Sequence, residues 1–162
     1  MIQTRQAKEE DLPEILDIYN QGIHDRIATL DIDMKDMSMM NTWFHEREAA
    51  SPLVVAVKED TVVGWASLSP YSSRYVYRKA AVLSIYVARQ KRGNGIGKRL
   101  LTAIEEAANN TGLHKIVLFL LPDNKQGHRL YDSAGYRKVG VMKEQGLMDG
   151  KYIDIILMEK II

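Results

Sequence analysis

The sequence predicts an α/β protein in which a mixed sheet carries helices on its faces, in the order β-α-α-β-β-β-α-β-α-β-β. Two observations support this fold class. Short runs rich in β-branched and aromatic residues alternate with segments whose apolar residues recur at helical spacing. A length of 162 residues, with no internal repeat and no linker, fits one domain, so we expect a single domain over residues 1–162.

The first half of the chain is expected to supply two helices and four strands. Pro13 stands at an early position of the first helix, where its missing N–H costs nothing. Pro52 is expected to end the second helix. In order, we expect a strand at Ile2–Gln6, a helix from Asp11 to Ile23, an irregular stretch at Ala28–Asp36, a helix at Met37–Ala49, strands at Leu53–Val57 and Val62–Leu68, a loop at Ser69–Tyr77 and a strand at Val82–Val87.

The second half contains the clearest helix, Gly95–Asn110, whose apolar residues form one face and which Gly112 terminates. The remaining elements are expected at Ile116–Leu121 (strand), Asn124–Ala134 (short helix), Tyr136–Val141 (strand) and Tyr152–Glu159 (strand).

The composition excludes several function classes. The formal net charge is +1, so no global field favours nucleic acid or a membrane surface, and any anion site must be local. The chain has no cysteine, which excludes disulfides, thiolate metal sites and a cysteine nucleophile and fits the reducing cytoplasm. The 4 histidines show no ligand spacing, so no metal is expected. The N-terminus lacks the apolar core of a signal peptide, and we expect a cytoplasmic protein.

The stretch from Ser84 to Lys98 carries the strongest functional signal. A strand runs into a basic, glycine-rich turn that opens directly onto the clearest helix. Glycines let the backbone approach a ligand, and the first amides of a helix attract anions. This arrangement is typical of a phosphate or pyrophosphate site, to which Arg92 and Lys98 would add charge.

Three kinds of anion loop were compared with this turn. A P-loop fails because Gly93 and Gly97 are too close and Arg99 follows Lys98. A dinucleotide fingerprint fails on the spacing of its third glycine and on its position in mid-chain. The third pattern, Arg/Gln-x-x-Gly-x-Gly/Ala, fits at every fixed position from Arg92 to Gly97. The turn thus resembles the coenzyme A pyrophosphate loop of the GNAT acetyltransferases; the alternative is a plain glycine turn with a solvated basic rim.

A second motif, from Asn124 to Tyr136, resembles the GNAT pattern of an Asn, an aromatic residue seven positions later and Gly-Phe/Tyr. The resemblance implies the GNAT acyl-CoA N-acyltransferase fold, acetyl-CoA as cofactor, and Tyr131 as the general acid that protonates the leaving thiolate. Alternatively, Tyr131 is a core aromatic residue and Asn124 a helix N-cap. The cofactor-binding residues that the resemblance implies are Ile85, Tyr86, Val87, Arg92, Gly93, Asn94, Gly95, Ile96, Gly97, Lys98 and Asn124.

Within GNAT, the chain is similar to the phosphinothricin acetyltransferase group, which acetylates the amine of small amino acids and their analogues. The resemblance runs from about Ile2 to Leu157 and implies direct transfer of acetyl to a small-molecule amine by a homodimer. Supporting segments are Ile18-Tyr19-Asn20, Ala28-Thr29, Trp43-Phe44, Ser84–Val87 and Met148–Asp154.

The chain departs from this group at two positions. Val82 stands where relatives commonly carry a Glu that accepts the ammonium proton, and Ile153 stands where phosphinothricin-detoxifying relatives often have His. A valine cannot take a proton, so another group, or solvent, must do so. The candidates named by the sequence are His24, Asp31 and Glu144, and each of these residue types is more often a surface residue than a base.

The resemblance also implies an acceptor pocket near Arg74, Tyr71 and Thr29. A guanidinium there could hold an amino-acid carboxylate with two hydrogen bonds, although a solvated loop arginine is the alternative. Two rival functions remain open. One is an acetyl-CoA-binding module with weakened catalysis, and the other is an acetyltransferase for protein N-termini or lysines, which needs an open peptide groove.

Overall fold

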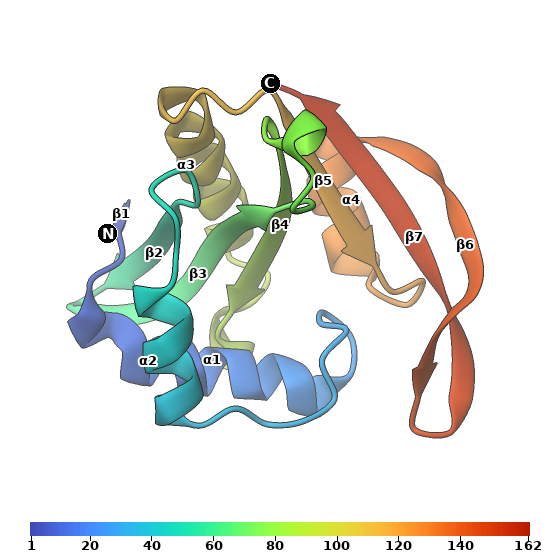
Figure 1. The fold of residues 1–162 in the computed structure, drawn as a ribbon. Coiled ribbons are helices and arrows are strands. Elements are labelled where there is room, and N and C mark those ends of the chain that lie inside the picture. The colour runs from blue at the N-terminus through green and yellow to red at the C-terminus, as the bar shows by residue number, and fades with distance from the viewer.

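A computed structural model describes residues Met1–Ile162 and contains one seven-stranded sheet in the order β1-β2-β3-β4-β5-β7-β6 (Figure 1). The predicted α/β class and the predicted order of elements are confirmed. The elements are β1 (Ile2–Gln6), α1 (Leu12–Asp25), α2 (Met37–His45), β2 (Leu53–Lys58), β3 (Thr61–Pro70), β4 (Ala80–Val87), α3 (Ile96–Asn110), β5 (Lys115–Leu120), α4 (Lys125–Ser133), β6 (Arg137–Met148) and β7 (Lys151–Ile161), with 3₁₀ turns at Glu9–Asp11, Tyr75–Tyr77 and Arg89–Lys91.

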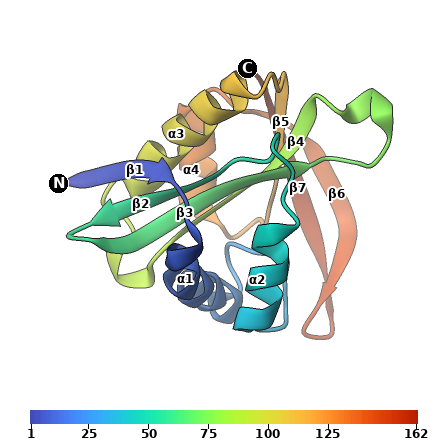
Figure 2. The same cartoon turned by 60° about the vertical axis from the view of Figure 1, so that its left-hand side comes forward.

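Helices cover both faces of the sheet, with α3 and α4 on one side and α1 and α2 on the other (Figure 2). Strand β2 shows how the sequence builds both layers. Its side chains alternate, so that Val54 and Ala56 pack under α3 while Leu53 and Val55 pack against α1. The apolar face of α3 is fully buried at Leu100 and Ile104, as its helical periodicity predicts. No helix has both the length and the apolar character needed to cross a bilayer.

The sheet splits in its middle. Strands β4 and β5 are its parallel pair, joined by a crossover through α3, and they pair only over Ala80–Val82. Strand β4 continues to Val87 and β5 to Leu120, and the two diverge toward the bottom of Figure 1. The edge of β4 beyond Val82 therefore has no strand beside it on this side.

Several boundaries differ from the prediction. Helix α2 ends at His45 and not at Ala49, because the chain turns back and Arg47 donates to the carbonyls of Ser51, Pro52 and Leu68 at 2.8, 2.9 and 2.8 Å. Strands β6 and β7 are longer than expected and form a hairpin. Its register shifts between Met142 and Gly146, which hides the alternation that identifies a strand in a sequence.

Candidate active site

The free edge of β4 supplies backbone donors to the split in the sheet. The Ala88 amide donates to the Val63 carbonyl of β3 at 3.0 Å. Because successive amides of a strand point in opposite directions, the Tyr86 amide also faces β3, whereas those of Ile85 and Val87 face the gap. These two N–H groups could donate hydrogen bonds to a polar ligand that lies along β4 in the place of a neighbouring strand.

The glycine-rich turn after β4 places the N-terminus of α3 at the end of this gap. Gly93 and Gly95 have φ of +79° and +76°, and a Cβ at either position would meet no protein atom within 4 Å. Glycine adopts this left-handed backbone without steric cost. The turn therefore exposes backbone, not side chains, beside the unpaired amides of the first helical turn, a geometry that favours phosphate groups.

Arg92 fixes the turn against β4. Its Nε donates to the Val87 carbonyl at 3.1 Å, and its Nη1 donates to Asp25 of α1 at 2.7 Å. Arg89 also donates to Asp25 at 2.7 Å. These hydrogen bonds, that from Arg89 foremost, lower the pKa of Asp25 to about 2. Arg92 thus lies at the predicted place, but its guanidinium is paired with Asp25, a residue 67 positions away that no sequence pattern identifies as its partner.

A cavity of about 430 Å³ opens between this turn, β4 and α4. Asn94 is the one predicted cofactor residue outside its lining; its amide donates to the carbonyls of Lys91 and Arg92 and closes the turn. Lys98 lies at the rim together with Lys91 and Arg129, and none of the three forms an ion pair within the chain. The lining contains Ile85, Tyr86, Val87, Arg92, Gly93, Gly95, Ile96, Gly97, Lys98, Asn124 and Tyr131 as predicted, and Ala28, Lys91, Gln126, Gly127, Arg129 and Leu130 in addition.

We call this space the donor cavity, because it fits acetyl-CoA. Amide donors along β4 match the extended amides of pantetheine, and the helix N-terminus with its free cations matches a pyrophosphate. Gln126 and Arg129 were missed by the sequence reasoning, which considered only the first of the two helices that face the cavity. The basic and amide side chains on the first two turns of α4 were the available signal.

Asn124 and Tyr131 line the donor cavity and also a second cavity, of about 200 Å³, on the other side of them. Asn124 is the N-cap of α4, where its Oδ1 accepts the Gly127 amide at 2.9 Å. Tyr131 is buried, with 6% of its surface exposed, and burial raises its pKa well above the usual range. A raised pKa keeps the phenol protonated at neutral pH, so Tyr131 keeps its O–H group, and it belongs to the linings of both cavities.

The second cavity, which we call the acceptor cavity, is mostly apolar. It is lined by Tyr19 of α1, the loop Ala28–Asp31, Val82–Tyr86 of β4, Leu118–Leu120 of β5, Asn124 and Tyr131. Thr29 lies in this lining as predicted, and so does Val82. Asp31 is the one charged side chain among these residues.

Arg74 and Tyr71 do not line the acceptor cavity, so this expectation is not met within one chain. Their loop leaves β3 after Pro70 and returns at Ala80, beyond the paired end of β4. Arg74 lines a separate cavity with Tyr75 and Tyr77. Of the three candidate bases, His24 and Glu144 also lie outside the acceptor cavity, and Asp31 lies within it.

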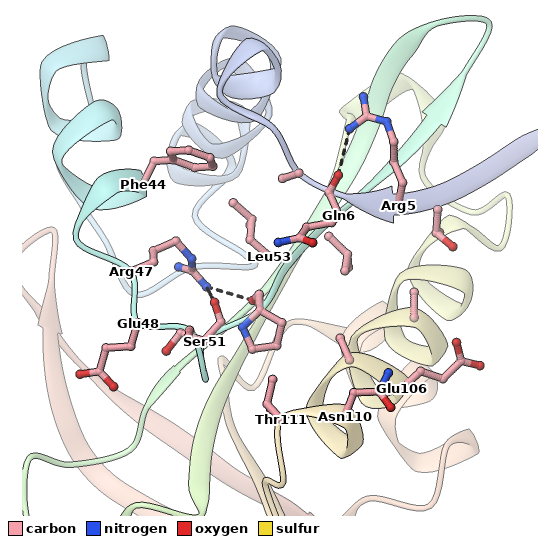
Figure 3. Close-up of a pocket in the computed structure, with 17 residues that line it drawn as sticks. Arg5, Gln6, Phe44, Arg47, Glu48, Ser51, Leu53, Glu106, Asn110 and Thr111 are labelled. Atoms are coloured by element: carbon pink, nitrogen blue, oxygen red, sulfur yellow. Dashed lines mark hydrogen bonds between the residues drawn. The ribbon is translucent and has the colours of Figure 1, made fainter.

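The largest cavity, about 670 Å³, is elsewhere (Figure 3). It lies between β1, β2, the end of α2 and α3, and it shares no residue with the donor or acceptor cavity. Figure 3 shows the Arg47 guanidinium directed at backbone carbonyls near Ser51, which it holds in place. Size is therefore a poor guide to the site here, because the donor and acceptor cavities are both smaller and yet share Asn124 and Tyr131.

Comparison with known proteins places this site in a family. The family model described as "Acetyltransferase (GNAT) family" matches residues 12–136. The chain belongs to the GNAT acetyltransferase family. The match contains the glycine-rich turn, Asn124 and Tyr131, so the donor and acceptor cavities lie almost wholly within it.

Individual GNAT relatives are similar over nearly their full length. An L-methionine sulfoximine/L-methionine sulfone acetyltransferase of Pseudomonas paraeruginosa is 30% identical over 157 residues, covering 96% of this chain and 91% of the relative. A ribosomal-protein-alanine N-acetyltransferase structure from Brucella melitensis has a TM-score of 0.95 at 32% identity, covering 99% of both chains. A phosphinothricin acetyltransferase structure from Sinorhizobium meliloti in complex with acetyl-CoA has a TM-score of 0.93 at 27% identity, covering 99% of this chain and 88% of that one.

These findings confirm the predicted resemblance to the phosphinothricin acetyltransferase group, the predicted enzyme class and the predicted cofactor. The chain is a GNAT N-acetyltransferase with acetyl-CoA as the acetyl donor.

Proposed function

We propose that this enzyme transfers acetyl from acetyl-CoA to the primary amine of a small molecule, a free amino acid or an amino-acid analogue of the methionine sulfoximine or phosphinothricin type. The observation that carries the proposal is the meeting of the donor and acceptor cavities at Tyr131. An amine in one cavity and a thioester in the other would face each other beside a buried phenol, as direct transfer requires.

Acetyl-CoA supplies an acetyl group activated as a thioester. The chain's own contribution is to bind, orient and donate a proton. The Ile85 and Val87 amides provide donors along the gap, and the first turn of α3 with Lys98 provides an anchor for phosphate. Tyr131 holds its proton at neutral pH, since burial raises its pKa, and can give it to the departing sulfur. Neither a covalent acyl-enzyme nor a serine or cysteine nucleophile is needed.

The size of the acceptor cavity supports a small acceptor. Its volume of about 200 Å³ holds a compact amino acid but not a peptide chain. The loop Ala28–Asp31 lines this cavity, and it is tied to the β6–β7 hairpin, which does not line it. They are bridged by Arg26, whose Nε donates to Asp149 at 3.0 Å while its Nη1 donates to the Ile32 carbonyl at 2.8 Å.

Acetylation of a protein N-terminus is the second candidate, favoured by the likeness to the Brucella ribosomal-protein-alanine N-acetyltransferase. It requires an open groove for a peptide next to the acceptor cavity. The third candidate, a binding module with weakened catalysis, is favoured by Val82 in place of the usual carboxylate.

We also propose that the enzyme is one domain over residues 1–162, acts as a homodimer and works in the cytoplasm, where acetyl-CoA is available. Exposed apolar residues on the β6–β7 hairpin support the dimer. Leu147 and Tyr152 are cross-strand partners and are 58% and 69% exposed, as large apolar side chains at a subunit contact would be in one protomer. Sedimentation equilibrium tests the dimer.

The experiment that tests the function is steady-state release of CoA with three sets of acceptors: free amino acids, methionine sulfoximine with phosphinothricin, and peptides beginning with alanine. We expect the highest kcat/KM in the first or second set. A preference for peptides would establish the second candidate. Tight acetyl-CoA binding without turnover in any set would establish the third.

A further inference from the structure

The acceptor cavity has an alkyl side chain at position 82, where the resemblance to the phosphinothricin acetyltransferase group implies a Glu. Val82 faces this cavity with an alkyl side chain, whereas an acceptor amine is a cation at neutral pH and cannot attack until it loses a proton. A replacement must lie in the same cavity to reach the amine. Asp31 is the one charged side chain in the lining, and it comes from the loop after α1.

Asp31 is held in place by its neighbours. The Tyr19 hydroxyl donates to Oδ2, and the Lys35 ammonium lies 3.8 Å from the same oxygen. The Asp31 amide donates to the Thr29 Oγ1 at 3.1 Å. The loop is closed further along by Asn20, whose side chain accepts from the Lys35 amide at 2.8 Å and donates to the Lys35 carbonyl at 3.0 Å.

These contacts leave one oxygen of Asp31 available. Every hydrogen bond and ion pair of its carboxylate within the chain goes to Oδ2, and none goes to Oδ1. The side chain is 44% exposed, so it is in contact with solvent and with any molecule that enters the cavity. A carboxylate with one anchored and one free oxygen is suited to receive an ammonium group.

We propose that Asp31 is the carboxylate that receives the acceptor's ammonium group and removes its proton, in the role that a Glu at position 82 would have. This proposal rests on the proposed function. One N–H proton of the ammonium passes to Oδ1, which leaves the nitrogen with a lone pair. The C–N bond then forms as the C–S bond breaks, and Tyr131 gives its proton to the departing sulfur. The second N–H proton of the amine passes to the Tyr131 phenolate. The proton held by Asp31 is released to solvent.

The proposal also bears on the substrate class. No cationic side chain lines the acceptor cavity, so a carboxylate has no charged partner in the lining, whereas Asp31 would recognise an ammonium. The acceptor is therefore selected first as a cation, and the amine need not be that of an amino acid.

The test compares Asp31→Asn with wild type on two acceptors, L-methionine sulfoximine and O-methylhydroxylamine. The first is an ammonium ion at neutral pH, whereas the second is largely uncharged and needs no base. The side-chain oxygen of an asparagine can still accept the hydrogen bond from the Tyr19 hydroxyl, so the loop should keep its conformation. Asp33→Asn is the matched control, since Asp33 lies in the same loop, is exposed and does not line the cavity. Acetyl-CoA affinity and the binding of L-methionine sulfoximine are measured by calorimetry on the same proteins.

We expect Asp31→Asn to lose at least about 30-fold in kcat/KM with L-methionine sulfoximine and less than about 3-fold with O-methylhydroxylamine, at unchanged acetyl-CoA affinity. Calorimetry should show weaker binding of L-methionine sulfoximine as well. Equal losses with both acceptors would assign Asp31 a structural role and overturn the proposal, as would unaltered rates with both. In either case wild-type activity would leave the proposed function standing. A wild type that binds acetyl-CoA but acetylates neither acceptor, nor any amine of the panel above, would overturn both.

Discussion

The two sides of the split sheet are built on different principles. The donor cavity takes most of its lining from one continuous stretch, the end of β4, the glycine-rich turn and the start of α3, and it presents backbone amides and free cations. The acceptor cavity takes its lining from α1, the loop after it, β4, β5 and α4, and it presents apolar side chains around one carboxylate. A contiguous stretch suits a ligand that is the same in every reaction, as the acetyl donor is. Side chains from distant segments can be substituted one at a time, and so they can determine which acceptor binds.

Tyr131 belongs to both sides, and its loss should have the largest effect. Tyr131→Phe should lower kcat on the order of 10²-fold, because the phenol acts only in the transition state, and should leave acetyl-CoA affinity within about 2-fold. Turnover with the best amine and calorimetry with acetyl-CoA measure the two quantities. Tyr136→Phe is the control, since Tyr136 is equally buried and packs edge-on against Tyr131 but lines neither cavity. Unchanged turnover in Tyr131→Phe would make Tyr131 a core residue only.

Gly95→Val tests whether the donor side depends on exposed backbone. Its Cβ would point into the donor cavity and its φ of +76° is unfavourable for valine, so we expect acetyl-CoA affinity to fall roughly 30-fold. Gly135→Val is the control. Gly135 has a φ of +86° and equal space around it, but it lies outside both cavities, so this change brings the strain without the obstruction. Similar affinities for acetyl-CoA in the two variants would remove the glycine-rich turn from the site.

The same difference explains what could be predicted from the sequence. The turn from Arg92 to Lys98 could be predicted because its function depends on backbone geometry that neighbouring residues determine. The acceptor side depends on which distant segments the fold brings together. The sequence names Asp31 as one of three candidate bases, and only the fold brings the loop after α1 into the lining of the acceptor cavity. Arg74 is expected in the same cavity from the sequence, but its loop lies beyond the paired end of β4 and lines a separate cavity.

The elements follow a similar rule. Helix α3 was predicted to within one residue because its apolar residues form one regular face that packs against the sheet. The β6–β7 hairpin was underestimated because β6 is an edge strand with a register shift and an exposed pattern on most of its length. No local pattern indicates that Arg92 and Arg89 meet Asp25, since the ion pairs join segments that only the fold brings together.

Asp25→Asn tests a long-range contact that joins the donor side to α1. The pKa of Asp25 is about 2 in the folded chain, below its ordinary value of 3.8, so its ionised form stabilises the fold. This contribution is present above about pH 4 and is lost as the pH falls toward 2. Because solvent screens the pair, we expect a loss of about 1 kcal/mol at pH 7, or a Tm lower by about 2–4 °C.

The Tm difference between wild type and Asp25→Asn should shrink as the pH falls below 4, which calorimetric unfolding at several pH values would follow. Acetyl-CoA affinity at pH 7 should fall about 3-fold, because Arg92 would lose its ion pair with α1 while keeping only its hydrogen bond to the Val87 carbonyl. A rise in affinity would instead mean that Asp25 only neutralises charge that the cofactor could use. A Tm difference independent of pH would contradict the assigned pKa.

The smallest effect is expected at the rim of the acceptor side, where Arg26 bridges the loop after α1 to Asp149 in the β6–β7 turn. Asp149→Asn removes the ion pair but keeps a residue that tolerates the φ of +50° found there. An exposed pair contributes little, so Tm should change by less than about 1 °C. If the bridge narrows the entrance, kcat/KM for a peptide beginning with alanine should rise about 2- to 3-fold, while that for L-methionine sulfoximine stays the same.

Lys143→Gln is the control, because it breaks the Lys143–Asp154 pair within the same hairpin and leaves the bridge intact. Equal effects of the two variants on the peptide would show that hairpin mobility, not the bridge, governs entry. A peptide rate that is high in wild type and unmoved by Asp149→Asn would mean that this side is already open, as the second candidate function requires.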